Sequence, residues 1–350
     1  MKESQSAASE LRNLPEEFDP SIYSARNPDL RGMNEAELAR HFATVGALEG
    51  RSASMVANRR AFIGLIPPGS SLLEVGPFAN PLKRGTGVKY LDVLSTDQLR
   101  DRARVHGVDP GACPHIDFVS ETGDFGVVTE RFDVVLSAHV VEHQPDLVHH
   151  LRGVASVLNP AGRYYLAVPD KRYCFDHFIA TSSIAEIVAA HAQAQRVHSV
   201  QSILEHGALT THNDTARHWA GDHGEPAYRA APSLIREAIE TFARSNGKYV
   251  DVHAWQFTPE SFRETLQALF ELSLSPLRVL RVYATVAGSN EFYAVLENTS
   301  QESLSLRKEL PADFDEQAYL LANPDVARAG VNAADHYLAF GRREGRKLRV

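Results

Sequence analysis

Short apolar segments alternate with helical segments between about residues 55 and 298, and this alternation limits the fold more than any other feature of the chain. Helical patterns such as MVANRRAFIGLI (55–66) and LVHHLRGVASVL (147–158) lie beside the apolar segments. Strands separated by helices predict βαβ units and a parallel sheet. The five strand candidates, rich in Val, Leu and Tyr, are SLLEVG (71–76), VKYLDV (88–93), HIDFV (115–119), FDVVLSA (132–138) and RYYLAVP (163–169).

The end of this region predicts a helix and then two antiparallel strands. FTPESFRETLQALFEL (257–272) has Thr258 as a helix N-cap and Pro259 in the first turn. LRVLRVYATV and NEFYAVLEN follow as a pair of strands. The expected fold class is therefore α/β, with a doubly wound, mostly parallel sheet.

The two ends of the chain match each other. LPEEFDPSIYSARNPDL, from Leu14, corresponds to LPADFDEQAYLLANPDV, from Leu310, and HFATVGALEGR (41–51) corresponds to HYLAFGRREGR (336–346). Each copy predicts two short helices, because Asn-Pro-Asp marks a turn with a fresh helix start. A unit this small has little core of its own, so we expect it to pack on the main domain, on the other copy or on a second subunit. The pattern resembles a short repeat found beside glycosyltransferases and other bacterial cell-surface proteins.

Three parts follow from these patterns. We expect an N-terminal helical repeat over 1–54, a main domain over 55–298 and a C-terminal helical repeat over 299–350. A long, His-rich stretch of about 170–250 reads as an insert in the main domain that serves as a substrate lid.

Composition excludes several classes of protein. The net charge of −8 argues against a nucleic-acid-binding protein, which usually carries a basic surface. Two cysteines form no disulfide framework and no zinc spacing, which fits a reducing cytoplasm. No apolar run reaches the length of about 18 residues that a membrane span needs, and the N-terminus has no signal-peptide core. The basic cluster GRREGRKLRV at the C-terminus is either a solvated tail or an anchor for a phosphate-bearing partner.

Acidic residues and one glycine end the first two strand candidates. Glu74 and Gly76 end the first, and Asp92 ends the second, where an acid usually holds a ribose diol. A glycine lets the backbone approach a ligand closely. Pro77 and Phe78 stand where a GxGxxG fingerprint would have further glycines, so a pyrophosphate cradle and a nicotinamide oxidoreductase are disfavoured. A nucleoside without phosphates, such as S-adenosylmethionine, suits these residues better.

The ordered set of ExG at 74–76, Asp92, FDVVLSAHVVEHQPD and VLNPAGRYYLAVPDKR resembles class I S-adenosylmethionine-dependent methyltransferases. The resemblance covers about 60–298. GPFANP, YLDVLST and VPDKRYCFDHF are similar to a bacterial subgroup found with surface-polysaccharide genes. The resemblance implies a Rossmann-like fold with a seven-stranded, mostly parallel sheet, and S-adenosylmethionine as cofactor.

The resemblance also implies roles for individual residues. Glu74 and Gly76 would lie at the methionine end of the cofactor, and Asp92 at its ribose. Glu121, with Asp124 as the competing candidate, would lie near the adenine amino group. The remaining expected cofactor contacts are Pro77, Asn80, Ala138 and His139.

Methyl transfer to an alcohol requires a group that takes the hydroxyl proton. The candidate catalytic residues are His143, His139, Asp170 and His177. His143 has the alternative role of packing beneath the site, and Asp170 that of an ion-paired loop residue. The segment EHGALTTHNDTARHWAGDHGE (205–225) holds four histidines and two aspartates, but its spacing matches no metal signature. We therefore expect no metal there and interpret the segment as a polar lid, with a divalent cation as the alternative.

The sequence thus predicts a cytoplasmic S-adenosylmethionine-dependent O-methyltransferase, with a sugar hydroxyl of a surface glycan or its precursor as acceptor. One alternative is a small metabolite or lipid as acceptor. The other is a non-catalytic scaffold with a degenerate fold. The terminal repeats could join two copies into a homodimer.

Overall fold

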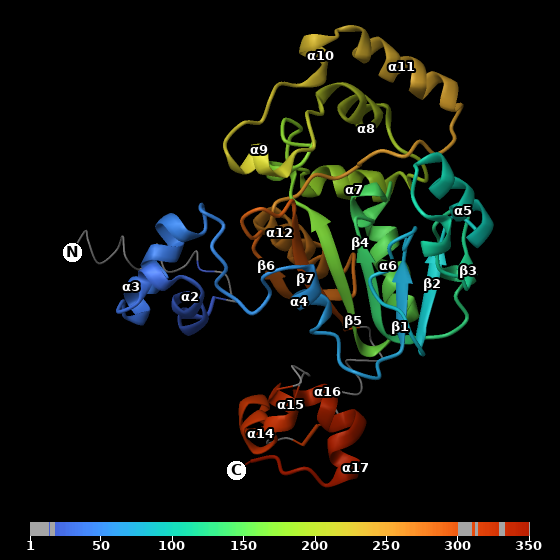
Figure 1. Cartoon of the computed structure of the whole chain (residues 1–350). Coiled ribbons are helices and arrows are strands. Elements are labelled where there is room, and N and C mark those ends of the chain that lie inside the picture. The colour runs from blue at the N-terminus through green and yellow to red at the C-terminus, as the bar shows by residue number, and fades with distance from the viewer. Residues whose placement is uncertain (1–13, 15–17, 300–309, 312–313, 329–332, 350) are drawn as a thin grey trace.

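The computed structural model describes residues 14, 18–299, 310–311, 314–328 and 333–349. Figure 1 shows a central sheet flanked by helices, with a helical insert above the strand ends and a small helical unit near each chain terminus. No helix in these described ranges is long and apolar enough to cross a membrane.

Seven strands form one sheet in the order β3-β2-β1-β4-β5-β7-β6. The strands β1 to β5 run parallel, and β7 is antiparallel to both β5 and β6. This confirms the expected α/β fold with a mostly parallel, methyltransferase-like sheet. The strand bounds are β1 Leu72–Val75, β2 Val88–Asp92, β3 Phe118–Val119, β4 Phe132–Ala138, β5 Leu158–Pro169, β6 Leu277–Tyr283 and β7 Glu291–Asn298.

Helices cover both faces of the sheet. On one face, α4 (Arg59–Ile63) packs Phe62 against β4, β5 and β7, and α5 (Thr96–Val105) packs Leu99 against Tyr90 of β2. On the other face lie α6 (Leu147–Val157) and α12 (Pro259–Glu271), whose apolar residues join the largest core cluster. Side chains alternate between these faces along each strand, so neighbouring residues of β1 enter different cores.

Several predicted elements are shorter or longer than expected. The helix predicted over 55–66 is reduced to α4, because Asn58 caps its start with a hydrogen bond to the Ala61 amide. The predicted strand 115–119 is only β3, which pairs with β2 at two positions on the sheet edge. Strand β5 starts five residues early, at Leu158. The N-cap at Thr258 and Pro259 at the start of α12 are confirmed.

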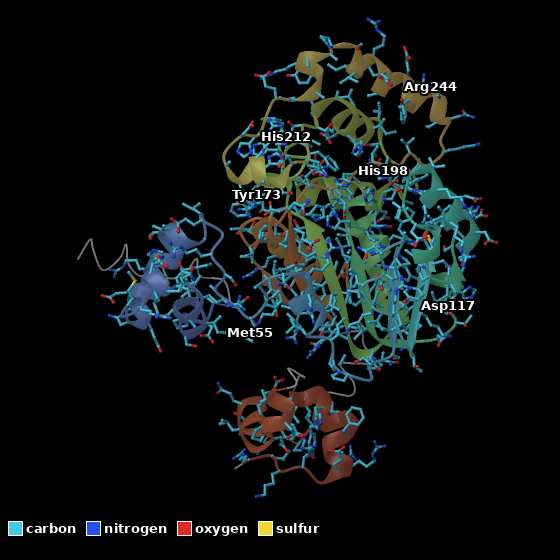
Figure 2. All side chains as sticks on the ribbon, viewed as in Figure 1. Met55, Asp117, Tyr173, His198, His212 and Arg244 are labelled. Atoms are coloured by element: carbon cyan, nitrogen blue, oxygen red, sulfur yellow. The ribbon has the colours of Figure 1, made fainter. Side chains whose placement is uncertain are left out.

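The helical insert follows β5 and lies over the carboxyl ends of the strands (Figure 1). Figure 2 shows labelled side chains of this region, with Tyr173 and His212 near α9 and Arg244 on the outer helix α11. Its helices are η7 Lys171–Tyr173, α7 Ile184–Ala192, α8 Val200–Leu204, η8 Glu205–Leu209, α9 Thr215–Trp219, α10 Ala227–Ala230 and α11 Ser233–Ser245. Short helical turns elsewhere are η4 Pro110–Ala112, η5 Phe125–Val127 and η6 Val141–His143.

The two terminal units contain the same kinds of element and the same contacts. The first holds α2 Pro20–Arg26, η2 Pro28–Leu30, α3 Glu35–His41 and η3 Phe42–Gly46; the second holds α14 Glu316–Ala322, α15 Pro324–Arg328, α16 Ala333–His336, η9 Tyr337–Gly341 and α17 Arg342–Glu344. In each, a fully buried tyrosine hydroxyl bonds a histidine Nδ1: Tyr23 with His41 at 2.9 Å and Tyr319 with His336 at 2.8 Å. Arg51 and Arg346 each pair with an aspartate, Asp29 and Asp325, at 2.7 Å.

The N-terminal unit is tied to the main domain by the Ala287 amide, which donates to the Gly50 carbonyl at 2.8 Å.

Candidate cofactor and acceptor site

A cavity of about 500 Å³ opens at the carboxyl ends of β1, β2 and β4. This is the edge of a doubly wound sheet at which ligands bind. Its size suits a small-molecule ligand. The polar and backbone groups that line it include Gly76 after β1, Asp92 at the end of β2, Arg102 and His106 around α5, His139 and His143 after β4, and Tyr249 and Asp251 after the insert.

The backbone at Gly76 can lie close to a ligand because it carries no side chain. Gly76 has φ +66°, a left-handed conformation, and a Cβ there would come within 3.0 Å of Val140 Cγ2. Its amide donates to the Leu91 carbonyl at 2.9 Å, which holds the turn against β2. Phe78 lines the same cavity with φ +44°, so the Gly-Pro-Phe segment turns sharply at the cavity wall.

Asp92 is a buried carboxylate at the end of β2. One of its oxygens accepts a hydrogen bond from the Leu94 amide at 2.9 Å, which fixes the side chain at the cavity wall. Burial raises the pKa of Asp92, and the amide of Leu94 opposes that rise by stabilising the anion. An oriented carboxylate at this place suits a vicinal diol, whose two hydroxyls both donate.

Glu74 does not line the cavity, although its burial suggested a ligand contact. Its two carboxylate oxygens accept from the amides of Leu82 and Lys83, at 2.7 and 3.1 Å. Burial raises the pKa of Glu74 to about 7. Strand alternation explains its position: Val75 lines the cavity, so Glu74 points to the opposite face of the sheet.

The other expected cofactor contacts also lie outside the cavity lining. Pro77, Asn80, Glu121 and Ala138 are not among the residues that form its wall. Glu121 is exposed. Asp124 is held by His149 at 2.5 Å, so neither candidate for the adenine end reaches the cavity in this structure.

Two of the four candidate catalytic residues, His139 and His143, line the cavity, and the other two do not. Asp170 is fully buried and accepts from Arg172 and from the Thr285 hydroxyl, so it is occupied by structural contacts. His177 lies after η7 and places its Nδ1 2.9 Å from the Arg172 carbonyl.

His139 is held in place by Glu291 of β7. Its φ is +53°, and its Nε2 lies 2.9 Å from a Glu291 oxygen. Burial opposes the charged ring, but the hydrogen bond to Glu291 and the charge of Glu142 together raise the pKa of His139. Burial would raise the pKa of Glu291, but hydrogen bonds from Arg59 and His139 outweigh it and hold the pKa at about 2. The pair therefore favours the protonated form of the His139 ring at the cavity.

His143 is held from the other side by Asp251. Its Nδ1 lies 3.1 Å from an Asp251 oxygen, and Asp251 also pairs with Arg102 at 2.9 Å. Burial opposes the charged ring, but the contact with Asp251 and the charge of Glu142 raise the pKa of His143. The neighbouring Glu142 is fully buried, and neither of its oxygens has a hydrogen-bond partner among the described residues.

Sequence reasoning missed part of the cavity wall. Leu99, Arg102 and His106 are spaced by one and two helical turns, so the face they share could have been found from helical periodicity. Tyr249 and Asp251 follow the long insert, and no signal in the sequence places them beside β2 and α5.

Comparisons with known proteins agree with this geometry. Residues 75–166 match the protein family described as "Methyltransferase domain". This segment runs from the end of β1 into β5 and contains Asp92, His139 and His143. No curated protein matches the sequence.

Solved structures resemble the chain only at low identity. The CcbJ methyltransferase from Streptomyces caelestis is 11% identical, with 71% of this chain and 92% of that chain covered and a TM-score of 0.36. The mitomycin 7-O-methyltransferase MmcR is 13% identical, with 84% and 66% covered and a TM-score of 0.33. A protein from Rhodobacter sphaeroides described as a Zn-dependent alcohol dehydrogenase is 15% identical, with 71% and 91% covered and a TM-score of 0.39. At such scores the likeness carries no argument about function.

The sheet order and the family match define a class I S-adenosylmethionine-dependent methyltransferase domain. The protein is accordingly an enzyme that uses S-adenosylmethionine as its methyl donor.

Proposed function

We propose that this methyltransferase transfers the methyl group to oxygen, with a sugar hydroxyl of a surface glycan or its precursor as acceptor. The observation that carries the proposal is the cavity that joins Gly76 and Asp92, on the cofactor side, to His139 and His143. The sugar acceptor is supported by GPFANP, YLDVLST and VPDKRYCFDHF, which resemble a bacterial subgroup found with polysaccharide genes. The terminal segments 1–54 and 299–350, as two copies of one repeat around a catalytic domain over 55–298, agree with a protein that acts on glycans in the cytoplasm.

Two groups of this chain would hold the cofactor. The Asp92 carboxylate would accept hydrogen bonds from the ribose hydroxyls, and the backbone at Gly76 would lie against the amino-acid end. When bound, S-adenosylmethionine supplies a methyl group on a cationic sulfur, which an oxygen nucleophile displaces in line. The residues present fit this group because Gly76 leaves open the space in which a Cβ would come within 3.0 Å of Val140 Cγ2.

The acceptor hydroxyl would meet the cavity near the ends of β4 and β5. His139, as an imidazolium paired with Glu291, would donate a hydrogen bond to the acceptor and orient it. His143, whose Nδ1 lies 3.1 Å from an Asp251 oxygen, lines the same cavity and would take part in activating the hydroxyl.

Calorimetry with S-adenosylhomocysteine tests the cofactor assignment. We expect Asp92→Asn to weaken binding about 10- to 100-fold, because a hydrogen bond to a charged group contributes about 1.5–3 kcal/mol. Asp97→Asn is the matched control, since Asp97 is an exposed acid on α5. Equal affinities of the two variants would remove Asp92 from the site.

An acceptor screen tests the substrate class. Nucleotide sugars and polysaccharide fragments should accept a labelled methyl group, and small phenols and fatty acids should not. Methylation of phenols alone would contradict the sugar assignment and leave the cofactor assignment intact.

A further inference from the structure

A buried carboxylate without a hydrogen bond among the described residues lies beside the cofactor cavity. Glu142, in the turn η6 after β4, has no exposed surface. Within the described part of the chain, both of its side-chain oxygens lack a hydrogen bond. The nearest cationic groups, Nδ1 of His139 at 3.7 Å and Nε2 of His143 at 3.9 Å, make ion-pair contacts but no hydrogen bond. A buried carboxylate without hydrogen bonds costs several kcal/mol, so a closer ligand for its oxygens is expected at this place.

Two imidazoles face this carboxylate. Nε2 of His143 lies 3.9 Å from a Glu142 oxygen. The ring of His253, which is 5% exposed, lies 4.6 Å from the ring of His143 at nearly a right angle. One nitrogen from each histidine and one oxygen of Glu142 all lie within 4.8 Å of one another.

Each of the two imidazoles is held from behind by a second carboxylate. Nδ1 of His143 lies 3.1 Å from Asp251, and Nδ1 of His253 lies 2.6 Å from Asp176. An aspartate can only accept, so Asp176 fixes the proton of His253 on Nδ1 and leaves its Nε2 lone pair for another group. Asp251 contacts His143 as an ion pair without a hydrogen bond. A carboxylate behind each histidine is the arrangement by which proteins orient metal ligands.

We propose that Glu142, His143 and His253 bind a divalent transition-metal ion. Two imidazoles and one carboxylate are a known ligand set for Zn²⁺ and for related ions, and they leave a position open for a further ligand. The site stands on its own geometry; its role in methyl transfer rests on the proposed function. Because His143 lines the cofactor cavity, the open position would face the acceptor, whose hydroxyl becomes more acidic when it binds such an ion.

A second cluster in the insert contrasts with this one. His177, His218 and His223 also lie close together. At least one ring nitrogen of each has a partner: Nδ1 of His177 lies near the Arg172 carbonyl, Nε2 of His218 near the His212 carbonyl, and Nδ1 of His218 lies 3.0 Å from Nδ1 of His223. This cluster contains no buried, unpartnered acceptor among the described atoms, so it does not require a cation.

Zn²⁺ titration by calorimetry tests the proposal on the full chain after treatment with a chelator. The wild-type protein should bind one Zn²⁺ in this site. Glu142→Gln and His253→Asn should each weaken that binding at least about 100-fold. Asp176→Asn, which disturbs only the positioning of His253, should weaken it about 10- to 100-fold.

Matched controls separate this site from others. His115→Asn removes an exposed histidine, and His218→Asn breaks the insert cluster. Both should retain the Zn²⁺ affinity of the wild type. Binding of S-adenosylhomocysteine by every variant shows that the variant is folded.

The outcomes are distinct. Loss of Zn²⁺ binding in Glu142→Gln and His253→Asn alone supports the site. Loss only in His218→Asn assigns the ion to the insert cluster and overturns the proposal. An absence of Zn²⁺ binding in the wild type, with S-adenosylhomocysteine still bound, also overturns it. Zn²⁺ binding without S-adenosylhomocysteine binding would instead contradict the proposed function.

Discussion

The ends of β1 and β4 each bury a glutamate, and the two glutamates have opposite surroundings. At β1, both oxygens of Glu74 accept from backbone amides of the following loop. Just beyond β4, neither oxygen of Glu142 has a partner among the residues described, and histidines surround it. Burial is nearly the same, at 2% and 0% exposed. The number of satisfied hydrogen bonds, and not burial, separates a carboxylate that shapes a loop from one that is available for chemistry.

The largest effect that would sharpen this contrast is on the rate of methyl transfer. Glu142→Gln keeps the shape of the side chain but removes its charge beside His143, and we expect kcat to fall about 10²- to 10⁴-fold, the range for the loss of an activating group. Glu74→Gln should leave kcat within a few-fold of the wild type. The measurement is the initial rate with an acceptor found in the screen. Similar losses in both variants would break the contrast.

The second largest expected effect is on cofactor affinity, and it tests whether Gly76, and not Glu74, is the cofactor contact at the end of β1. Gly76→Val should weaken the binding of S-adenosylhomocysteine at least about 100-fold, because a branched side chain fills the space beside Val140 and disfavours φ +66°. Gly69→Val is the control, since Gly69 also has positive φ, at +81°, but has open space around its Cβ position. Calorimetry and thermal unfolding of both variants separate lost binding from lost folding. Unchanged affinity in Gly76→Val would place the cofactor elsewhere.

The smallest expected effect is on the free energy of unfolding, and it depends on Glu74 alone. Glu74→Gln should lower the free energy of unfolding by about 1–3 kcal/mol, because one of the two loop amides loses its acceptor. The substitution should also change how the free energy of unfolding depends on pH. The folded pKa of Glu74 is raised from 4.5 to about 7, so its contribution to stability is present below pH 4.5 and is lost as pH rises to about 7.

Denaturant unfolding between pH 4.5 and pH 8 measures this contribution. The wild type should show a decline in stability between about pH 4.5 and 7 that is reduced in Glu74→Gln. Glu130→Gln, at an exposed ion pair with Lys89, is the control and should keep the wild-type slope. Identical slopes in all three proteins would show that Glu74 ionises normally.

The elements that carry the fold could be predicted because each has a local signal. The apolar runs gave β1, β2 and β4 within one residue at each end, and Thr258 marked the start of α12. Gly76 and Asp92 were expected at the site because strand ends converge at one edge of a parallel sheet, and His139 and His143 because of the resemblance to methyltransferases. All four line the cavity.

The rest of the site depends on information that no short segment contains. The face on which Glu74 lies could have been read from the alternation of β1, but its partners belong to a loop whose path is set by tertiary packing. Asp251 and His253 approach His143 across more than a hundred residues of chain, so their pairing was not predictable from spacing. The environment of Glu142 is likewise a property of the folded chain.

The contact between the N-terminal unit and the insert has a practical consequence. The indole of Trp219, in α9, stacks on Tyr173 at 3.9 Å, and a Cβ on Gly50 would come within 2.5 Å of that indole. Residue 50 thus packs against the side chain of Trp219 in the insert. Removal of the first 54 residues would uncover that aromatic surface, so a shortened chain would differ from the full chain at the start of the insert.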